Sequence, residues 1–375
     1  MNASFQAVCE AAAERWDVPA LVVGTQEGVV AVGCDVDTRF RIASITKPMT
    51  AMLASRLLDL EATTGVWPDD VRVRHLLSHT SGFDSELADG HNEKYGSGDD
   101  ALASCAADLP AIRRFIGVET AWSYANTGYW LAGFLSAVRA ASTFEDALAE
   151  HVLRPAGLEA TDFGAPDVAG TGRDARPEPY PRSRRPSGGL VSNLSDLLRF
   201  ARWFATAGAS QRVVQGRPVA GVYGLGLFGE RVGGIDVWGH SGSWGGFQSS
   251  FLTVPTHDAF FVGLTNSSLG SKALAEIEDV FFERVVGQRR TKPSFVEPRA
   301  GELAQFTGTY ENSDARIDVT ATPNELLLET GGEELVGRKI GDGVFRVPEG
   351  PHVDERFDFP LDGFGRFGSR LAVRR

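Results

Sequence analysis

Residues 40–47 of the chain read Phe40-Arg41-Ile42-Ala43-Ser44-Ile45-Thr46-Lys47. The stretch passes from a short apolar segment into a predicted helix, in which Ser44 and Lys47 stand three positions apart and therefore share a face. A serine hydroxyl needs a nearby base before it can attack a carbonyl carbon, and a lysine crowded by apolar or cationic groups can lose its proton and act as that base. Since this spacing also arises by chance, its meaning depends on the rest of the chain.

A second pair of polar residues, Tyr124 and Asn126, stands just before a helix that is predicted from Thr127 to Ala140. A tyrosinate held beside Lys47 can take the proton of Ser44, and an asparagine amide can bind a substrate carbonyl. The alternative is structural, with the tyrosine packed on the core and the asparagine capping the helix. Taken by themselves, the two residues favour the structural interpretation.

A third segment, residues 238–247, follows the strand-like alternation of Ile235 and Val237 and contains His240-Ser241-Gly242-Ser243. Small residues on an edge strand let a substrate backbone lie close. His240 can assist proton transfer or bind substrate, although a single histidine near a strand end is more often a bystander.

The three motifs, in the order SxxK, YxN and HSG, resemble those of the serine β-lactamase and penicillin-binding-protein-like family. The resemblance is to its class C-like branch, which includes D-alanyl-D-alanine carboxypeptidases, D-aminopeptidases and family VIII carboxylesterases. Further segments match the family pattern, so that the resemblance covers most of residues 1–287: Val73–Gly82, Leu153–Leu158 and Pro186–Leu190. The tail, with Phe306-Thr307-Gly308-Thr309-Tyr310, resembles the lipocalin-like domain that many members carry.

The resemblance implies an α+β fold: a β-lactamase/transpeptidase-like antiparallel sheet flanked by helices, a helical subdomain, and then a small all-β domain. It also implies catalytic roles for three residues, with Ser44 acylated and Lys47 and Tyr124 sharing the role of base. Substrate binding is implied for Asn126, His240, Gly242 and Ser243, in which the backbone N–H groups of Ser44 and Ser243 form the oxyanion hole. The resemblance calls for no metal and no cofactor.

One departure from the family pattern concerns the third motif, which usually begins with lysine and here begins with His240. Lysine supplies a fixed positive charge for a substrate carboxylate, whereas a histidine is mostly neutral at pH 7. The departure therefore argues against β-lactamase and carboxypeptidase activity. It favours ester or amide substrates without an essential carboxylate.

The sequence pattern divides the chain into a β-lactamase-like catalytic domain (1–287), a linker (288–299) and a small antiparallel, lipocalin-like β-barrel domain (300–375). Strands are predicted near both ends of the first domain, so we expect a sheet built from the two ends with a helical insert between them. Residues 164–187 read as a long loop with a run of arginines. We interpret this run as a solvated face; the alternative is a rim for an acidic substrate.

Helices are predicted from the apolar periodicity of several segments, with Ser195-Asp196 expected near the cap of one of them. The predicted helical ranges are 3–16, 44–60, 71–79, 127–140, 144–152, 194–207 and 271–286.

Composition limits the partners of the chain. A net charge of −12 and a pI near 5.1 disfavour nucleic acid, and no stretch reaches the length of a membrane-spanning helix. No secretory signal pattern is found at the N-terminus, which leads us to expect a cytoplasmic protein. The three cysteines, Cys9, Cys34 and Cys105, are an odd number without a CxxC pair, so we expect buried, reduced thiols.

Other catalytic chemistries lack support in the sequence. His75 and His79 have the spacing of zinc ligands on a helix, but Leu76 stands where the HExxH motif needs its glutamate. We interpret both histidines as structural or capping residues. No nucleotide-binding pattern and no GxSxG elbow occurs either.

Three functions remain open at this point. The first is a serine hydrolase that acts through an acyl-enzyme on an ester or a small amide or peptide. The second is an acyltransferase or cyclase of a biosynthetic pathway, in which an alcohol or amine resolves the same acyl-enzyme. The third is a non-catalytic acyl-binding or sensor protein. The expected partner is a small-molecule ester, amide or peptide substrate, and the oligomeric state is unknown.

Overall fold

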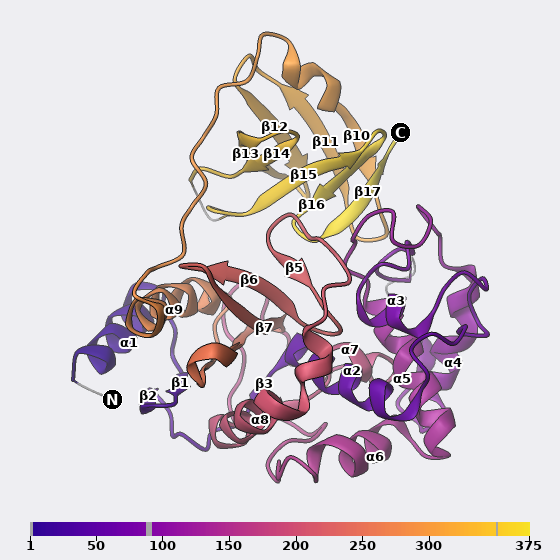
Figure 1. Ribbon diagram of the computed structural model, residues 1–375, viewed down its shortest axis with the longest axis vertical. Helices are drawn as coiled ribbons and strands as arrows, with labels where there is room; N and C mark the ends of the chain where they lie inside the picture. Colours follow the sequence, from indigo (N-terminus) through magenta and orange to yellow (C-terminus); the bar gives the residue numbers. More distant parts are fainter. Residues whose placement is uncertain (1–2, 88–91, 350–351) are drawn as a thin grey trace.

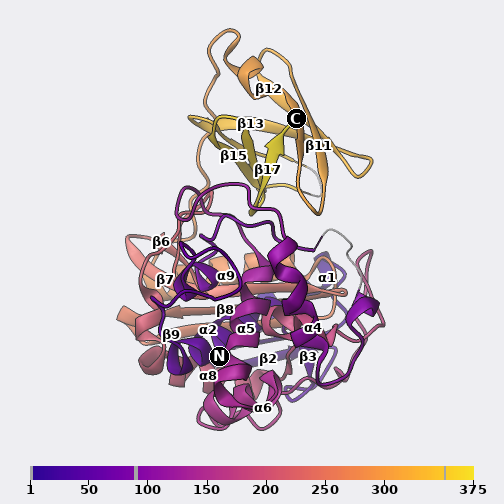
Figure 2. The same ribbon diagram turned by 90° about the vertical axis from the view of Figure 1, so that its right-hand side faces the viewer.

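The computed structural model describes residues 3–87, 92–349 and 352–375 (Figure 1). A mixed sheet-and-helix part carries a smaller all-β part above it, and the turned view in Figure 2 shows the same arrangement. A mixed fold with an antiparallel sheet and a separate C-terminal β domain is therefore confirmed. In the described ranges, no helix is both long and apolar enough to cross a membrane.

The main sheet is antiparallel and draws its strands from both ends of the first 287 residues, as the sequence predicts. Val22 pairs with Leu264, which joins the N-terminal hairpin to the last strand of the sheet. The strand order among the described residues is β2-β1-β9-β8-β7-β6-β5. The strands are β1 (Leu21–Thr25), β2 (Gly28–Val32), β5 (Val222–Tyr223), β6 (Phe228–Val232), β7 (Ile235–Trp244), β8 (Phe247–Val254) and β9 (Ala259–Thr265).

Helices cover both faces of this sheet. On one face, α1 (Ala3–Arg15) and α9 (Gly270–Val286) bury Phe5, Phe281 and their apolar neighbours against the strands. On the other face lies α8 (Leu194–Ala207) together with the helical part of the chain. Burying both faces removes apolar side chains from water, which is the main favourable term in folding.

The helical part lies to the right of the sheet in Figure 1 and contains short helices joined by long loops. Its helices are η1 (Ala43–Ile45), α2 (Thr46–Leu57), α3 (Val73–Leu77), η2 (Asn92–Tyr95), α4 (Ala101–Asp108), η3 (Leu109–Ala111), α5 (Asn126–Ala140), α6 (Phe144–Leu148), η4 (Ala149–Leu153), η5 (Arg182–Arg184) and α7 (Arg185–Gly188).

Several local predictions are corrected here. The helix predicted from Ser44 begins as a 3-10 turn and becomes α-helical at Thr46. The cap of α8 is Asn193, whose side chain accepts a hydrogen bond from the backbone N–H of Asp196, so Ser195-Asp196 lies inside the first turn. Cys34 is only partly buried, in contrast to Cys9 and Cys105.

The C-terminal part is a closed antiparallel barrel around a core of apolar side chains that includes Tyr310, Leu326 and Phe345. A coil over residues 288–300 leads to it, followed by the short helix η8 (Glu302–Phe306). The domain boundaries at 287 and 299 stay a prediction. In the described residues the barrel strands are β10 (Gly308–Glu311), β11 (Arg316–Ala321), β12 (Glu325–Thr330), β13 (Glu333–Gly341), β14 (Val344–Arg346), β15 (Arg356–Leu361), β16 (Phe364–Phe367) and β17 (Arg370–Arg374).

A buried arginine attaches the barrel to the rest of the chain. Arg366 is 4% exposed and donates to both carboxylate oxygens of Asp358, at 2.8 and 2.5 Å. Its remaining donor reaches the backbone oxygens of Trp122 and Arg217, each at 3.0 Å. One side chain therefore links the barrel to two separate loops of the sheet-and-helix part.

We expect Arg366→Met to lower the free energy of unfolding by about 3–5 kcal/mol, because it leaves the buried carboxylate of Asp358 without its charge partner. Urea unfolding followed by circular dichroism measures the change. The matched control is Arg316→Met in the same barrel, where the exposed ion pair with Asp318 should contribute little to stability. Equal losses in the two variants would show that Arg366 does not hold the barrel in place.

Candidate active site

Ser44 stands on a strained turn between a short strand and a helix. Strand β3 (Phe40–Arg41) pairs with β4 (Val191–Ser192) and brings the chain to Ala43, whose φ of +44° lies in the left-handed region. Non-glycine residues rarely adopt this conformation, and it concentrates at functional sites. The half-buried Ser44 follows directly.

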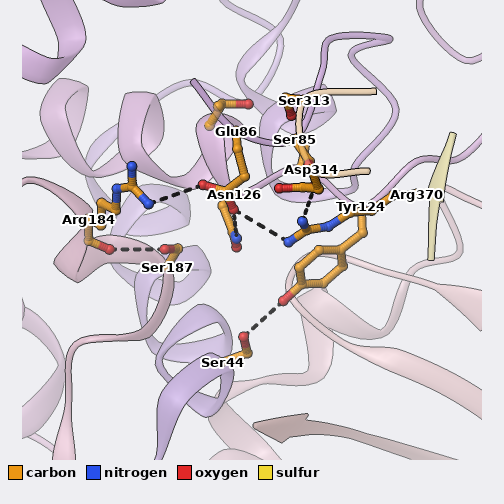
Figure 3. Close-up of polar contacts among 12 residues, drawn as sticks. Ser44, Ser85, Glu86, Tyr124, Asn126, Arg184, Ser187, Ser313, Asp314 and Arg370 are labelled. Carbon is orange, nitrogen blue, oxygen red and sulfur yellow. Dashed lines mark hydrogen bonds and ion pairs between the residues drawn. The ribbon is translucent and has the colours of Figure 1, made fainter. Parts of the chain in front are cut away.

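Two side chains from separate elements reach the Ser44 hydroxyl. Lys47 Nζ lies 3.1 Å from Ser44 Oγ, one turn along the helix. Tyr124 Oη lies 3.0 Å from the same oxygen and comes from the loop before α5 (Figure 3). The first two sequence motifs therefore meet at one atom.

Lys47 is fully buried, and its amine donates to the backbone oxygen of Ser187 at 2.6 Å. The amine also lies 4.8 Å from the centre of the Tyr124 ring and 5.4 Å from that of Tyr129. Burial holds the pKa of Lys47 well below its ordinary value of 10.5, with Glu86 acting in the opposite direction and Arg370 in the same direction. The neutral amine, which can accept a proton, is thereby favoured.

Tyr124 has the opposite tendency. Burial raises the pKa of its phenol, and the hydrogen bond with Ser44 only partly offsets that increase. The phenol is therefore neutral and donates its proton toward Ser44. The two pKa shifts together favour a neutral amine at Lys47 and a neutral phenol, not a tyrosinate, at Tyr124.

A cavity of about 530 Å³ opens beside Ser44. Of the residues predicted from sequence, Ser44, Tyr124, Asn126, His240 and Ser243 line it. Gly242 stands behind the wall: a Cβ atom there would come within 2.2 Å of the backbone oxygen of Ile42, so only glycine lets β7 approach the nucleophile turn this closely.

The third motif presents an open strand edge to this cavity. The pairing of β6 with β7 ends at Gly239, so in the described part of the chain no strand pairs with the β6-facing edge of residues 240–244. On the other side β7 stays paired with β8 up to Trp244. An unpaired edge of this kind can hydrogen-bond an extended substrate.

His240 has both of its ring nitrogens engaged, as a chain of four hydrogen bonds shows. The N–H of Ala125 donates to His79 Nδ1 at 3.0 Å, which places the proton of His79 on Nε2. That nitrogen lies 3.2 Å from Tyr223 Oη and donates to it, so the Tyr223 hydroxyl is free to donate to His240 Nε2, also at 3.2 Å. His240 Nδ1–H then donates to the backbone oxygen of Ser241 at 2.5 Å.

Burial, together with the nearby Lys47, lowers the pKa of His240 to about 3, and burial likewise keeps the pKa of His79 well below 6.5. Both rings are therefore neutral and fixed in one tautomer. They connect the loop of the second motif to the strand of the third. The expectation that His79 is structural agrees with this chain, and His75 Nδ1 caps α3 by accepting from the backbone N–H of Arg72.

Asn126 is the first residue of α5, and its amide donates to Glu86 Oε1 (Figure 3). Glu86 in turn lies between two guanidinium groups, those of Arg184 and Arg370. Sequence reasoning missed all three of these charged residues. The only signal was the arginine run of residues 164–187, which was interpreted as a solvated face; Arg184 in fact lines the cavity.

The barrel also takes part in the site. The backbone N–H of Tyr124 donates to the carbonyl of Ser369 at 2.8 Å, and the N–H of Leu371 donates to Ser123 Oγ at 3.0 Å. Ser369 and Arg370 both line the cavity. The start of β17 thus supports the Tyr124 loop directly.

Comparisons with known proteins agree with this architecture. The solved structure of SurE with D-Leu is similar at a TM-score of 0.78 and 23% identity, over 99% of this chain and 99% of that one. The likeness extends over the barrel as well as the sheet-and-helix part.

Sequence relatives point in the same direction. Penicillin-binding protein 4 of Amycolatopsis lactamdurans is 26% identical over 79% of this chain and 90% of its own length. A D-aminopeptidase of Cereibacter sphaeroides is 24% identical over 91% of this chain and 70% of its own length. The family profile described as Beta-lactamase matches residues 10–280, most of the chain. With its sheet, its helical part and this match, the chain belongs to the beta-lactamase family of hydrolases.

Proposed function

We propose that this chain is a serine hydrolase that forms an acyl-enzyme on Ser44 with an ester or a small amide or peptide. The observation that carries the proposal is the convergence of Lys47 Nζ and Tyr124 Oη on Ser44 Oγ, at 3.1 and 3.0 Å. A nucleophile within hydrogen-bond reach of its base is the arrangement that covalent catalysis requires.

In the acylation step Ser44 Oγ attacks the substrate carbonyl carbon while its proton passes to the neutral amine of Lys47. The tetrahedral oxyanion is held by the backbone N–H groups of Ser44 and Ser243. The proton then returns through the Tyr124 hydroxyl to the leaving alkoxide or amine, and the bond to that group breaks. In the second half of the reaction a water molecule attacks the acyl carbonyl carbon and gives a proton to Lys47. The bond between the acyl carbon and Ser44 Oγ then breaks, Ser44 Oγ takes up that proton, and the acid leaves.

Asn126 orients the substrate amide, and the unpaired edge of residues 240–244 binds the substrate backbone next to it. His240 belongs to the wall and holds the strand, since neither of its nitrogens is free for the substrate. The name of one relative, a D-aminopeptidase, supports amides and peptides that contain a D-residue as the first substrates to test.

A second candidate is acyl transfer, in which an amine or alcohol replaces water. It is favoured by the residues of the barrel, Ser369 and Arg370, that line the cavity. These residues add to the surface on which an acyl acceptor other than water can bind. An acyl-enzyme that never turns over would instead support a sensor role.

We expect Ser44→Ala to abolish turnover of 4-nitrophenyl esters, with a loss of about a million-fold in kcat as in other serine hydrolases. Intact-mass spectrometry should find one acyl group on the wild-type protein and none on the variant. Ser55→Ala, in the helix α2 that follows Ser44, is the control, because its hydroxyl only donates to the backbone of Ala51. Undiminished turnover by Ser44→Ala would remove the assignment.

The lowered pKa of Lys47 determines the expected pH dependence. Activity needs the neutral amine, so kcat/KM should be low at acid pH and rise with pH through a single ionisation whose midpoint lies well below 10.5. His240, with a pKa of about 3, stays neutral throughout this range and should not cause the rise of kcat/KM with pH. A midpoint that moves when His240 is replaced by Gln, at constant fold, would contradict the role of Lys47.

Hydrolysis and transfer are separated by adding a D-amino acid amide to the reaction with a 4-nitrophenyl ester. If transfer is the function, the acylated amide should replace the acid as the main product at millimolar amine, although the amine is then roughly ten thousand times or more dilute than water. Chromatography of the products gives the ratio. Acid as the sole product at every amine concentration would leave hydrolysis as the reaction.

A further inference from the structure

The buried hydroxyl of Ser187 has all of its hydrogen-bonding positions filled. Its Oγ lies 2.8 Å from Trp130 Nε1 and 3.0 Å from Tyr180 Oη. The same oxygen lies 3.0 Å from the backbone oxygen of Arg184 (Figure 3). A serine hydroxyl has one proton to donate and two lone pairs that accept, so these three contacts use it completely. The side chain of Ser187, a residue that is 1% exposed, is therefore fixed from three sides.

The direction of each of these hydrogen bonds follows from the atoms involved. An indole N–H can only donate and a carbonyl oxygen can only accept, so the Ser187 proton points to the oxygen of Arg184. The Tyr180 hydroxyl must therefore donate to Ser187 Oγ. Burial raises the pKa of Tyr180 to about 12, so its phenol keeps this proton at neutral pH.

The backbone carbonyl of the same serine holds the amine of Lys47. Lys47 Nζ lies 2.6 Å from Ser187 O and 3.1 Å from Ser44 Oγ. A neutral amine has two protons and one lone pair, and it can turn about its Cε–Nζ bond unless a proton is held. With one proton on the Ser187 carbonyl, the lone pair can face the Ser44 hydroxyl, which is the orientation that a general base needs.

Tyr180 reaches Ser187 from the long loop, of which residues 172–179 are exposed. Its side chain lines the active-site cavity, and its ring packs edge-on against that of Trp244, with 5.1 Å between the ring centres. Trp244 stands at the end of the open strand edge of residues 240–244. Tyr180 therefore contacts this edge with its ring and Ser187 with its hydroxyl.

We propose that Tyr180 and the Ser187 hydroxyl are positioning residues for the base, Lys47. This inference rests on the proposed function and adds two residues to it that none of the three motifs contains. The Tyr180 hydroxyl fixes Ser187, the Ser187 carbonyl fixes one proton of the amine, and the lone pair of the amine is thereby kept on Ser44. Hydrogen bonds behind a catalytic group hold it within about 0.5 Å of its productive position. Full activity of the base therefore depends on the position of the loop that carries Tyr180.

The test compares the variants Tyr180→Phe and Ser187→Ala on 4-nitrophenyl acetate, whose acetyl group is too small to extend along the strand edge. Tyr180→Phe keeps the ring and removes one hydrogen bond, so kcat and kcat/KM should fall by the same factor, about threefold to tenfold. Ser187→Ala leaves the Trp130 N–H and the Tyr180 O–H without their acceptor. It should lower both constants by about tenfold to a hundredfold, at an unchanged KM.

The double variant separates positioning from direct contact with the substrate. If Tyr180 acts through Ser187, Tyr180→Phe should have no further effect on kcat in the Ser187→Ala protein. Effects that multiply in the double variant would show that the Tyr180 hydroxyl acts on the substrate itself, and would overturn the inference. A raised KM at unchanged kcat, which indicates lost substrate binding, or unchanged kinetics in the folded variants would overturn it too.

Tyr95→Phe and Ser136→Ala are the matched controls. The Tyr95 hydroxyl donates to Asp108 at 2.9 Å, and neither residue lines the active-site cavity. The buried Ser136 hydroxyl donates to the backbone oxygen of Ala132 at 2.7 Å. Both controls should keep the wild-type kcat, and an equal loss in them would count against the inference.

Thermal unfolding of each variant separates loss of position from loss of fold. If Ser187→Ala unfolds, Tyr180→Phe still tests the inference, because its kcat and KM alone distinguish positioning of the base from binding of the substrate.

Ser44→Ala distinguishes a failure of this inference from a failure of the proposed function. If turnover depends on Ser44 while Tyr180→Phe and Ser187→Ala leave it unchanged, only the positioning role is wrong. If Ser44→Ala hydrolyses 4-nitrophenyl acetate as fast as the wild-type protein, the proposed function is wrong and the positioning role falls with it.

Discussion

The amine of Lys47 is buried between the carbonyl of Ser187 and the hydroxyl of Ser44, at 2.6 and 3.1 Å. Moving an ammonium ion out of water costs about several kcal/mol. The buried position of Lys47 therefore favours a neutral amine. Much of the nearby structure serves to hold it there. The Pro186–Gly188 turn supplies the carbonyl, the rings of Tyr124 and Tyr129 exclude water, and the strained turn at Ala43 brings the hydroxyl into reach.

The histidine of the third motif, His240, is also held in its neutral form. His79, Tyr223 and His240 form a hydrogen-bonded chain in which each proton has one position, and this chain joins the loop of the second motif to strand β7. The positive charge of the cavity comes from the guanidinium groups of Arg184 and Arg370, between which Glu86 lies (Figure 3).

The local and periodic features could be predicted from the sequence, and the contacts between distant segments could not. Helices α8 and α9, the Ser44–Lys47 spacing and the strand pattern of β7 depend on neighbours a few residues away. The cap at Asn193 was missed because a run of several capping residues offers the same chemistry at each position. Glu86 meets Arg370 across 284 residues of sequence, and neither residue has a local pattern that marks it. His240 cannot bind substrate through Nε2 because this nitrogen contacts the Tyr223 hydroxyl. Tyr223 belongs to none of the three motifs, so the sequence gives no sign of this contact.

The segment that leads into β17 supplies the carbonyl of Ser369 to the backbone of Tyr124 and the Arg370 side chain to the cavity. The surroundings of Ser44 are therefore built from two parts of the chain that are far apart in the sequence. If the barrel separated from the sheet-and-helix part, the Tyr124 loop would lose its backbone contact and the cavity would lose a section of its wall. Movement at the joint between the two parts would thus be transmitted to the Ser44 hydroxyl through the Tyr124 side chain.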